Sequence, residues 1–170
     1  NILRKGLVMR VLNPEHCRLL MEMSEGIASY QMLGMHVVQM DMDSATVEMH
    51  TKSEMDNGSG IMHGGMVASL LDTVVWWAAY GSFEVEEDAV TLSLNIDYVK
   101  PVIPGQDIVI AKARLVRRGR TIAIVDTDCY NEKGQLVARG SAKLFVTARY
   151  GGENASKNPR ASLPPKFLEK

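Results

Sequence analysis

The sequence predicts an α+β fold in which an antiparallel sheet of about six strands wraps around one long apolar helix. Residues 63–81 are apolar over a helical length, which predicts that helix. A hairpin pattern precedes this stretch and four segments of alternating hydrophobicity follow it. At 170 residues, of which 46% are hydrophobic, the chain is long and apolar enough to fill one such core.

The residues before the first strand predict one additional helix over 14–33. Asn13 suits an N-cap, Pro14 suits the first helical position, and Gly34 closes the segment. Apolar residues recur at helical spacing between these ends: Leu19, Leu20, Met23, Ile27 and Tyr30. From Met35 the period changes to two, which predicts a hairpin over residues 35–49 with its turn at Asp43-Ser44.

Four strands are expected after the apolar helix, over residues 90–99, 108–116, 121–130 and 136–147. Short turn signals separate the last three, so we expect the strands to be sequential and antiparallel. Beyond Arg149 the chain is polar and carries glycine and proline pairs, which predicts a mobile tail unless it docks on a neighbour. The expected organisation is an N-terminal extension (1–33), a central domain (34–147) and a C-terminal tail (148–170).

Charge and composition exclude several classes of protein. Lys and Arg number 19 against 20 Asp and Glu, so we expect no nucleic-acid partner and no membrane partner. The two cysteines, Cys17 and Cys129, have no metal-ligand spacing, and the first residues lack the pattern of a signal peptide. A cytoplasmic location fits these observations, and we assign no metal site.

Two features of the apolar helix predict chemistry. Asp72 is the only carboxylate within it, and its apolar neighbours suggest a buried charge that needs a partner or a task. His63-Gly64-Gly65 begins the helix, where free backbone N–H groups can hold an oxyanion and glycine allows close approach. Each feature alone also has a structural explanation, as a hydrogen-bonded helical Asp or as loop punctuation.

Residues 57–72 (NGSGIMHGGMVASLLD) closely resemble the signature of hotdog-fold thioesterases, in the branch of the phenylacetate-pathway and Arthrobacter-type 4-hydroxybenzoyl-CoA enzymes. Residues 94–101 and 119–121 are similar to other segments of that family. The resemblance implies a hotdog fold and an enzyme that hydrolyses the thioester of an acyl-coenzyme A to a free acid and CoA. It implies no cofactor, because coenzyme A is part of the substrate.

The same resemblance implies roles for individual residues. Asp72 is the expected nucleophile or general base, and the N–H of Gly64 is expected to polarise the thioester carbonyl. Asn57 and His63 are expected to position the catalytic groups. Thr91 stands where some relatives carry a serine that orients water, although an ordinary strand threonine explains this residue equally well.

A turn rich in arginine is the expected seat of coenzyme A. The residues concerned are Arg117, Arg118, Gly119, Arg120 and Thr121. Guanidinium groups bind phosphate well, and the resemblance favours that role. A solvated hairpin accounts for the same residues without any ligand.

Helix geometry predicts a homo-oligomer with shared active sites. Gly64 and Asp72 are eight residues apart, which on one helix is roughly 12 Å. A reacting carbonyl must lie near about 3 Å from both groups. Gly64 of one subunit should therefore serve Asp72 of another, in a dimer or a dimer of dimers.

Two other functions remain open at this point. A hotdog dehydratase or hydratase also places a carboxylate and a histidine near an acyl thioester, although the spacing from His63 to Asp72 favours the hydrolase branch. A non-catalytic acyl-CoA sensor needs an output module, and 33 residues before the domain are too few for a convincing one. The sequence does not identify the acyl group.

Overall fold

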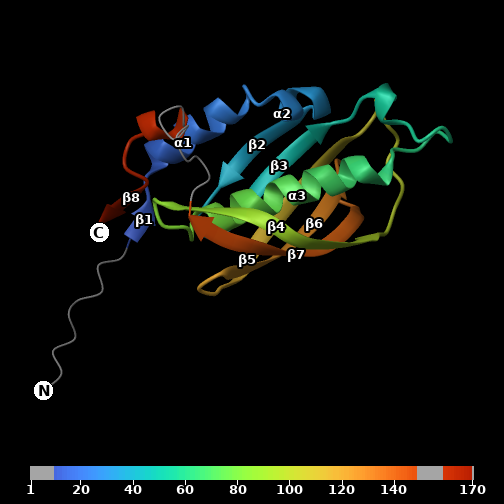
Figure 1. The fold of residues 1–170 in the computed structure, drawn as a ribbon. Helices are drawn as coiled ribbons and strands as arrows, with labels where there is room; N and C mark the ends of the chain where they lie inside the picture. Colours follow the sequence, from blue (N-terminus) through green and yellow to red (C-terminus); the bar gives the residue numbers. More distant parts are fainter. Residues whose placement is uncertain (1–9, 149–158, 170) are drawn as a thin grey trace, which may run out of the picture.

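The structure is a computed structural model that describes residues 10–148 and 159–169 (Figure 1). The helices are α1 (Pro14–Ser24), α2 (Ala28–Leu33) and α3 (Gly64–Tyr80), with short 3₁₀ turns η1 (Ser53–Met55) and η3 (Pro159–Ser162). The strands are β1 (Arg10–Leu12), β2 (Met35–Met40), β3 (Ser44–His50), β4 (Glu87–Tyr98), β5 (Ile108–Arg118), β6 (Ile122–Asn131), β7 (Leu136–Ala148) and β8 (Phe167–Glu169). No helix among these elements is long and apolar enough to cross a membrane.

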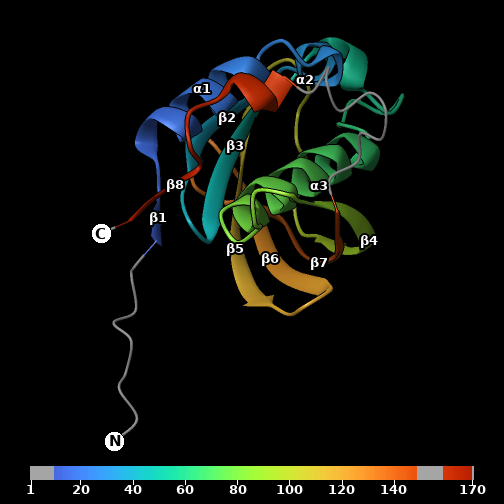
Figure 2. The same ribbon diagram turned by 60° about the vertical axis from the view of Figure 1, so that its left-hand side comes forward.

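Six strands form one antiparallel sheet in the order β2-β3-β5-β6-β7-β4, and α3 lies across one of its faces (Figures 1 and 2). The expected strands and the long helix are all present. The expectation of sequential pairing is wrong for β4, which pairs with β7 and not with β5. The reason is that α3 carries the chain across the sheet before β4 begins, so β4 joins the far edge.

The core lies between α3 and the sheet. The fully buried helix residues include Leu70, Leu71, Val74 and Val75. Small residues on the facing strands, Ala111 and Ala123 among them, are also completely buried. Small side chains let the helix backbone approach the strands closely. The side of α3 opposite this buried face points away from the sheet.

The N-terminal extension contains two helices where one was expected. Asn13 caps α1 as predicted, because its side chain accepts a hydrogen bond from the N–H of Glu15. The helix ends at Ser24, and Ile27 then adopts an extended conformation before α2 starts. Gly26 lies in this break, and its low helix propensity favours an interruption here.

Residues 159–169, which we call the C-terminal strap, pack against the N-terminal extension. β8 pairs antiparallel with β1, and the side chain of Asn13 donates to the carbonyl of Pro165. Lys166 is only 5% exposed and donates to the carbonyls of Tyr80 and Phe83 at the end of α3. The strap is therefore not a mobile tail: it docks within its own chain, where two buried carbonyls accept hydrogen bonds from the Lys166 ammonium. Residues 149–158 of that tail lie outside the described residues.

Candidate active site

Asp72 lies on the side of α3 that faces away from the sheet. The flanking Leu71 and Val74 are fully buried, whereas Asp72 is exposed. The expectation of a buried carboxylate is therefore wrong for the single chain. Ser69, Thr73 and Trp76 are half-buried on the same side of the helix, so Asp72 belongs to a partly open stripe along α3.

The carboxylate of Asp72 is held by Thr91 on β4. The hydroxyl of Thr91 donates to Oδ1 of Asp72 at 2.8 Å. A register shift in β4 follows Thr91, where the pairing with β7 moves by one residue before Ser93. The structure thus brings together two residues that are 19 positions apart and that the sequence singled out separately.

The N-terminal end of α3 carries the second group of expected residues. His63 is the N-cap, and its Nδ1 accepts a hydrogen bond from the N–H of Gly65 at 2.9 Å. With Nδ1 accepting, the neutral ring carries its proton on Nε2. The N–H of Gly64 donates to no acceptor among the described residues, so it is available to a ligand oxygen.

Asn57 and Gly64 line one cavity of about 420 Å³. The loop that carries Asn57 is closed by a hydrogen bond from its N–H to the carbonyl of Ile61. Tyr98 also lines the cavity, and its hydroxyl donates to the carbonyl of Gly64 at 3.0 Å. A Cβ added at Gly64 would lie 3.3 Å from the Tyr98 ring, so the space here suits glycine.

Sequence reasoning missed Tyr98 as a site residue. Its alternation with Leu94 and Ile96 predicted only a place on the apolar face of β4. A signal was present, because Tyr98 lies within residues 94–101, one of the segments similar to the family. Only the structure shows its ring against the start of α3.

Within one chain the expected catalytic residues form two separate groups. We call Asn57, His63 and Gly64 the donor half, and Asp72 with Thr91 the carboxylate half. The helix is continuous from Gly64 to Tyr80, which keeps the two halves roughly 12 Å apart. Among the described residues that line the cavity of the donor half there is no carboxylate. Within the described part of one chain, the donor half therefore lacks a carboxylate nearby, and the carboxylate half lacks the N–H of Gly64 nearby.

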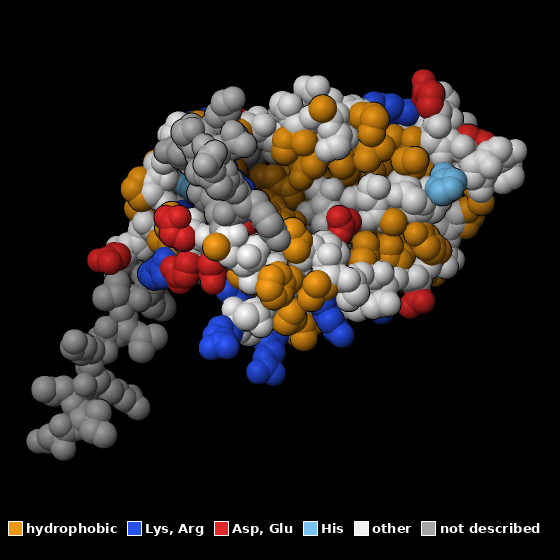
Figure 3. All heavy atoms as spheres, in the orientation of Figure 1, with side chains coloured by type: hydrophobic (Ala, Val, Ile, Leu, Met, Phe, Trp, Pro, Cys, Tyr) orange, Lys and Arg blue, Asp and Glu red, His pale blue; other side chains and the backbone are white. Residues whose placement is uncertain are grey.

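The arginine turn divides into two kinds of residue. Arg118 is paired with Glu87 at 2.8 Å, and both side chains are mostly buried. Its guanidinium is thus engaged in holding the turn against β4. Arg117 and Arg120 are exposed, as is Thr121, while Gly119 makes the backbone hydrogen bond to Ile122 that closes the turn. In Figure 3, Lys and Arg side chains gather along the edge of the molecule where this hairpin lies.

Strand register places this turn at the level of Thr91. Arg118 is paired with Ala123, which is paired with Leu144, which in turn is paired with Thr91. Three steps between neighbouring strands amount to roughly 14 Å. The arginine turn and the carboxylate half therefore lie at the same end of the sheet.

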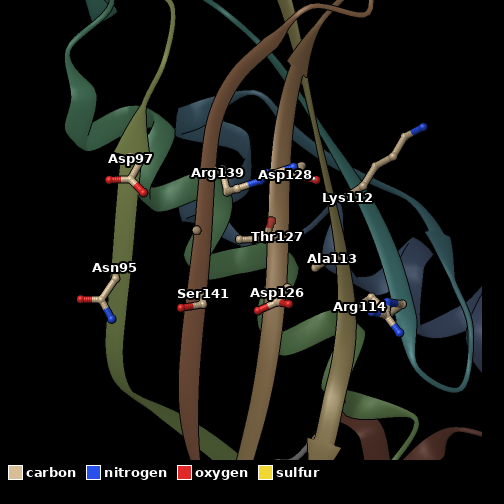
Figure 4. Close-up of a pocket in the computed structure, with 11 residues that line it drawn as sticks. Asn95, Asp97, Lys112, Ala113, Arg114, Asp126, Thr127, Asp128, Arg139 and Ser141 are labelled. Atoms are coloured by element: carbon tan, nitrogen blue, oxygen red, sulfur yellow. Dashed lines mark hydrogen bonds and ion pairs between the residues drawn. The ribbon is translucent and has the colours of Figure 1, made fainter.

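A further hollow, of about 620 Å³, lies on the opposite face of the sheet and crosses β4, β5, β6 and β7. Figure 4 shows its side chains in front of the strands with the helices behind them. Charged groups dominate it, and Arg139 is paired there with Asp128. It contains none of the expected site residues. The described residues also contain no group of three or more His, Cys, Asp and Glu side chains that could hold a metal ion.

Comparison with known proteins identifies the family. Residues 59–138 match the model of the thioesterase superfamily. The chain is 31% identical over 116 residues to the acyl-coenzyme A thioesterase PaaI of Escherichia coli. The matched residues make up 68% of this chain and 80% of that protein. The chain belongs to the thioesterase superfamily.

Within the superfamily the chain is similar to the phenylacetate-pathway branch. The structure of the E. coli PaaI protein from the phenylacetic acid degradation operon superposes with a TM-score of 0.72 at 27% identity, covering 81% of this chain and 96% of that one. The predicted hotdog fold is thereby confirmed.

Human acyl-coenzyme A thioesterase 13 is 35% identical over 94 residues, which are 55% of this chain and 66% of that protein, just under two thirds of its length. The Streptococcus mutans protein smu.793, solved bound to acetyl CoA, has a TM-score of 0.62 at 29% identity, with 68% of this chain and 90% of that one covered.

Proposed function

We propose that this protein is an acyl-CoA thioesterase that hydrolyses an acyl-coenzyme A to a free acid and CoA. The observation that carries the proposal is the geometry of α3, which presents a carboxylate held by a hydroxyl and an unoccupied backbone donor at its start. Family membership, and relatives that are named as acyl-CoA thioesterases, support the same reaction.

The two halves supply complementary steps of this reaction. In one route Asp72 takes a proton from a water molecule while the oxygen of that water adds to the thioester carbonyl. In the other route the carboxylate of Asp72 itself adds to the carbonyl, and water then cleaves the resulting anhydride. In both routes the carbonyl oxygen becomes an oxyanion at the N–H of Gly64, the C–S bond breaks, and the departing thiolate gains a proton. Thr91 occupies Oδ1 of Asp72, which leaves Oδ2 for the reacting molecule.

The separation of the halves supports a homodimer whose two sites are each built from both subunits. β4 is an edge strand of the sheet and carries Thr91. Leu92 is 57% exposed and Tyr98 is 54% exposed on this strand, and such a long edge with apolar side chains favours pairing with another copy. Association along β4 would cover the open side of α3 and bring a donor half to a carboxylate half.

Binding of coenzyme A is assigned to the exposed arginines of the β5–β6 turn, Arg117 and Arg120. All steps of the reaction use protein groups and water, so no resident cofactor is proposed. Cys17 and Cys129 are free and buried, which suits a reducing compartment such as the cytoplasm. Burial raises the pKa of the Cys129 thiol to about 12, so this thiol is no candidate nucleophile.

Replacing Asp72 by Asn tests the proposal, because the amide keeps the shape of the carboxylate and loses its basicity. We expect hydrolysis of acyl-CoA substrates, followed by release of free thiol, to fall by at least about 10²-fold. Far-UV circular dichroism and size-exclusion chromatography should match the wild type.

Ser69→Ala, on the same side of α3, is the matched control and should retain activity. Turnover of Asp72→Asn within about tenfold of wild type would exclude the assignment. Hydration of an enoyl-CoA without thiol release by the wild type would favour the lyase alternative, and binding without turnover would favour a sensor.

A further inference from the structure

A second cavity, of about 390 Å³, combines α3 and the start of β4 with parts of the chain that lie outside the matched residues 59–138. Its wall is formed by the N-terminal extension, α3, the start of β4 and the C-terminal strap: Leu20, Met23, Ser24, Ile27, Tyr30, Trp76, Trp77, Asp88 and Arg160. Figure 3 shows hydrophobic side chains lining a hollow between the α1–α2 segment and α3. Its volume is within the range of about 300–1,000 Å³ that small-molecule sites occupy.

This cavity adjoins the carboxylate half of the candidate active site. Trp76 follows Asp72 by one helical turn on the same side of α3, a rise of roughly 6 Å. Tyr30 accepts a hydrogen bond from Nε1 of Trp77 at 2.9 Å, which fixes its ring in the wall. Burial raises the pKa of Tyr30, and the negative charge of Asp72 adds to the effect, as expected for neighbouring groups.

We propose that this cavity binds the acyl group of the thioester substrate and that it favours an aliphatic chain such as decanoyl over both a single aromatic ring and a short chain. The inference rests on the proposed function, since it takes Asp72 as the place where the thioester reacts. It assigns substrate selection to Ile27, Met23 and Trp76, which line the cavity.

The shape of the cavity favours an aliphatic chain over a single aromatic ring. A cavity of about 150 Å³ already holds benzene, so about 390 Å³ is more than one ring needs. The rings of Trp76 and Trp77 meet edge to face at 85°, so they do not form two parallel plates around a planar group. Opposite them lie Leu20, Met23 and Ile27, flexible apolar side chains that adapt to a chain.

An ion pair forms part of the wall of the cavity. Arg160 of the strap is paired with Asp88 at 2.6 Å, and Nε1 of Trp76 donates to the same carboxylate at 3.0 Å. Burial opposes ionisation of Asp88, but the hydrogen bonds from Arg160 and from the N–H of Ala89 outweigh it and lower its pKa. An apolar chain that reached this ionised pair would desolvate it, so the pair limits the length of the acyl group.

Filling the cavity tests the proposal. Ile27→Trp adds a large side chain to the wall, and Met32→Trp is the matched control, because Met32 lies on α2, is 66% exposed and does not line the cavity. Hydrolysis of decanoyl-CoA and butanoyl-CoA is measured for both variants. In Ile27→Trp the ratio of kcat/KM for decanoyl to butanoyl should fall at least tenfold, and in Met32→Trp it should stay unchanged.

An unchanged ratio in folded Ile27→Trp overturns the proposal. So does equal loss of both activities, since a general defect is not selection by length. If Ile27→Trp does not fold, Met23→Phe replaces it, with the same expected fall in the ratio and the same result against it.

Intrinsic fluorescence separates a failure of this inference from a failure of the proposed function. Trp76 and Trp77 are the only two tryptophans of the chain and both line the cavity. The non-hydrolysable thioether S-decyl-CoA should change tryptophan emission with saturation, whereas S-methyl-CoA should change it little. If no acyl-CoA is hydrolysed but S-decyl-CoA gives this response, the proposed reaction fails and the acyl site stands. No response to S-decyl-CoA overturns the acyl site even when hydrolysis is present.

Discussion

Asp72 shows why residues adjacent in sequence are a poor guide to the surroundings of a helical residue. Its neighbour Leu71 and the nearby Val74 are buried against the sheet, while Asp72 is exposed. Successive side chains on a helix point in directions about 100° apart, so an apolar flank does not imply an apolar environment. What sets Asp72 apart in the structure is its hydrogen bond from Thr91.

The three arginines of the β5–β6 turn also have different surroundings although they are close in sequence. Sequence placed them together, but Arg118 is paired with Glu87 while Arg117 and Arg120 are exposed. We predict that Arg117→Ala with Arg120→Ala raises KM for acyl-CoA several-fold and changes kcat little, because exposed guanidinium groups bind phosphate without entering the reaction. Steady-state kinetics at low and high salt measure this, and the effect should shrink as salt rises.

Arg118→Ala is the informative comparison for that double variant. It removes the ion-pair partner of Glu87, which among the described residues keeps only the hydrogen bond from the N–H of Glu84, so we expect loss of about 1–2 kcal/mol of folding free energy and little change in KM. If the double variant keeps the wild-type preference for a full acyl-CoA over a pantetheine thioester, the exposed arginines belong to a solvated turn.

At the scale of elements, the C-terminal strap contributes to the fold although its composition is polar. Lys166 donates to the carbonyls of Tyr80 and Phe83 at 2.6 Å each and lies 3.9 Å from the centre of the Tyr80 ring. Tyr80 is the last residue of α3, so the ammonium meets the negative end of the helix dipole. The strap thereby closes one end of the core.

We predict that Lys166→Met destabilises the protein by about 2 kcal/mol, because two buried carbonyls lose a charged donor while the volume of the side chain is nearly kept. Urea unfolding followed by circular dichroism measures the change. Lys133→Met, in the exposed turn after β6, is the control and should stay within about 0.5 kcal/mol of wild type. A similarly small effect at Lys166 would mean that the strap adds little to stability.

At the scale of the whole molecule, one chain by itself does not bring the two halves of the proposed site together. Gly64 of the donor half and Asp72 of the carboxylate half lie on one continuous helix, which keeps residues eight positions apart from meeting at one carbonyl. The edge strand β4 and the open side of α3 offer the surface through which a second copy would complete each site.

Mixing two inactive variants tests this arrangement. Gly64→Val should block the donor half, since even a Cβ at this position crowds the Tyr98 ring, and Asp72→Asn should disable the carboxylate half. In a heterodimer one site carries both changes and the other carries neither. Thiol release should therefore return to as much as half of the wild-type rate per dimer.

Mass spectrometry establishes that the subunits have exchanged. Mixed Asp72→Asn with Asp72→Ala dimers are the control and should stay inactive. Exchanged Gly64→Val and Asp72→Asn dimers without activity would show that the site is not shared in this way.

The sequence by itself determined the α+β class, the long helix and the six strands of the main sheet, because each has a local cause. Hydrophobic period distinguishes strand from helix, and Asn13 and Pro14 mark a helix start that the structure reproduces. The family resemblance also singled out Asp72, within residues 57–72, and Thr91, where some relatives carry serine; the structure joins the two by a hydrogen bond.

Only the tertiary structure decided what depends on contacts between distant segments. It placed β4 beside β7, exposed Asp72, paired Arg118 with Glu87, and brought Arg160 of the strap to Asp88. None of these has a signature in local period or composition, because side chains many residues apart satisfy one another's charge and hydrogen bonds only after the chain has packed. The cavity beside Trp76 arises in the same way, from two ends of the chain closing over the helix between them.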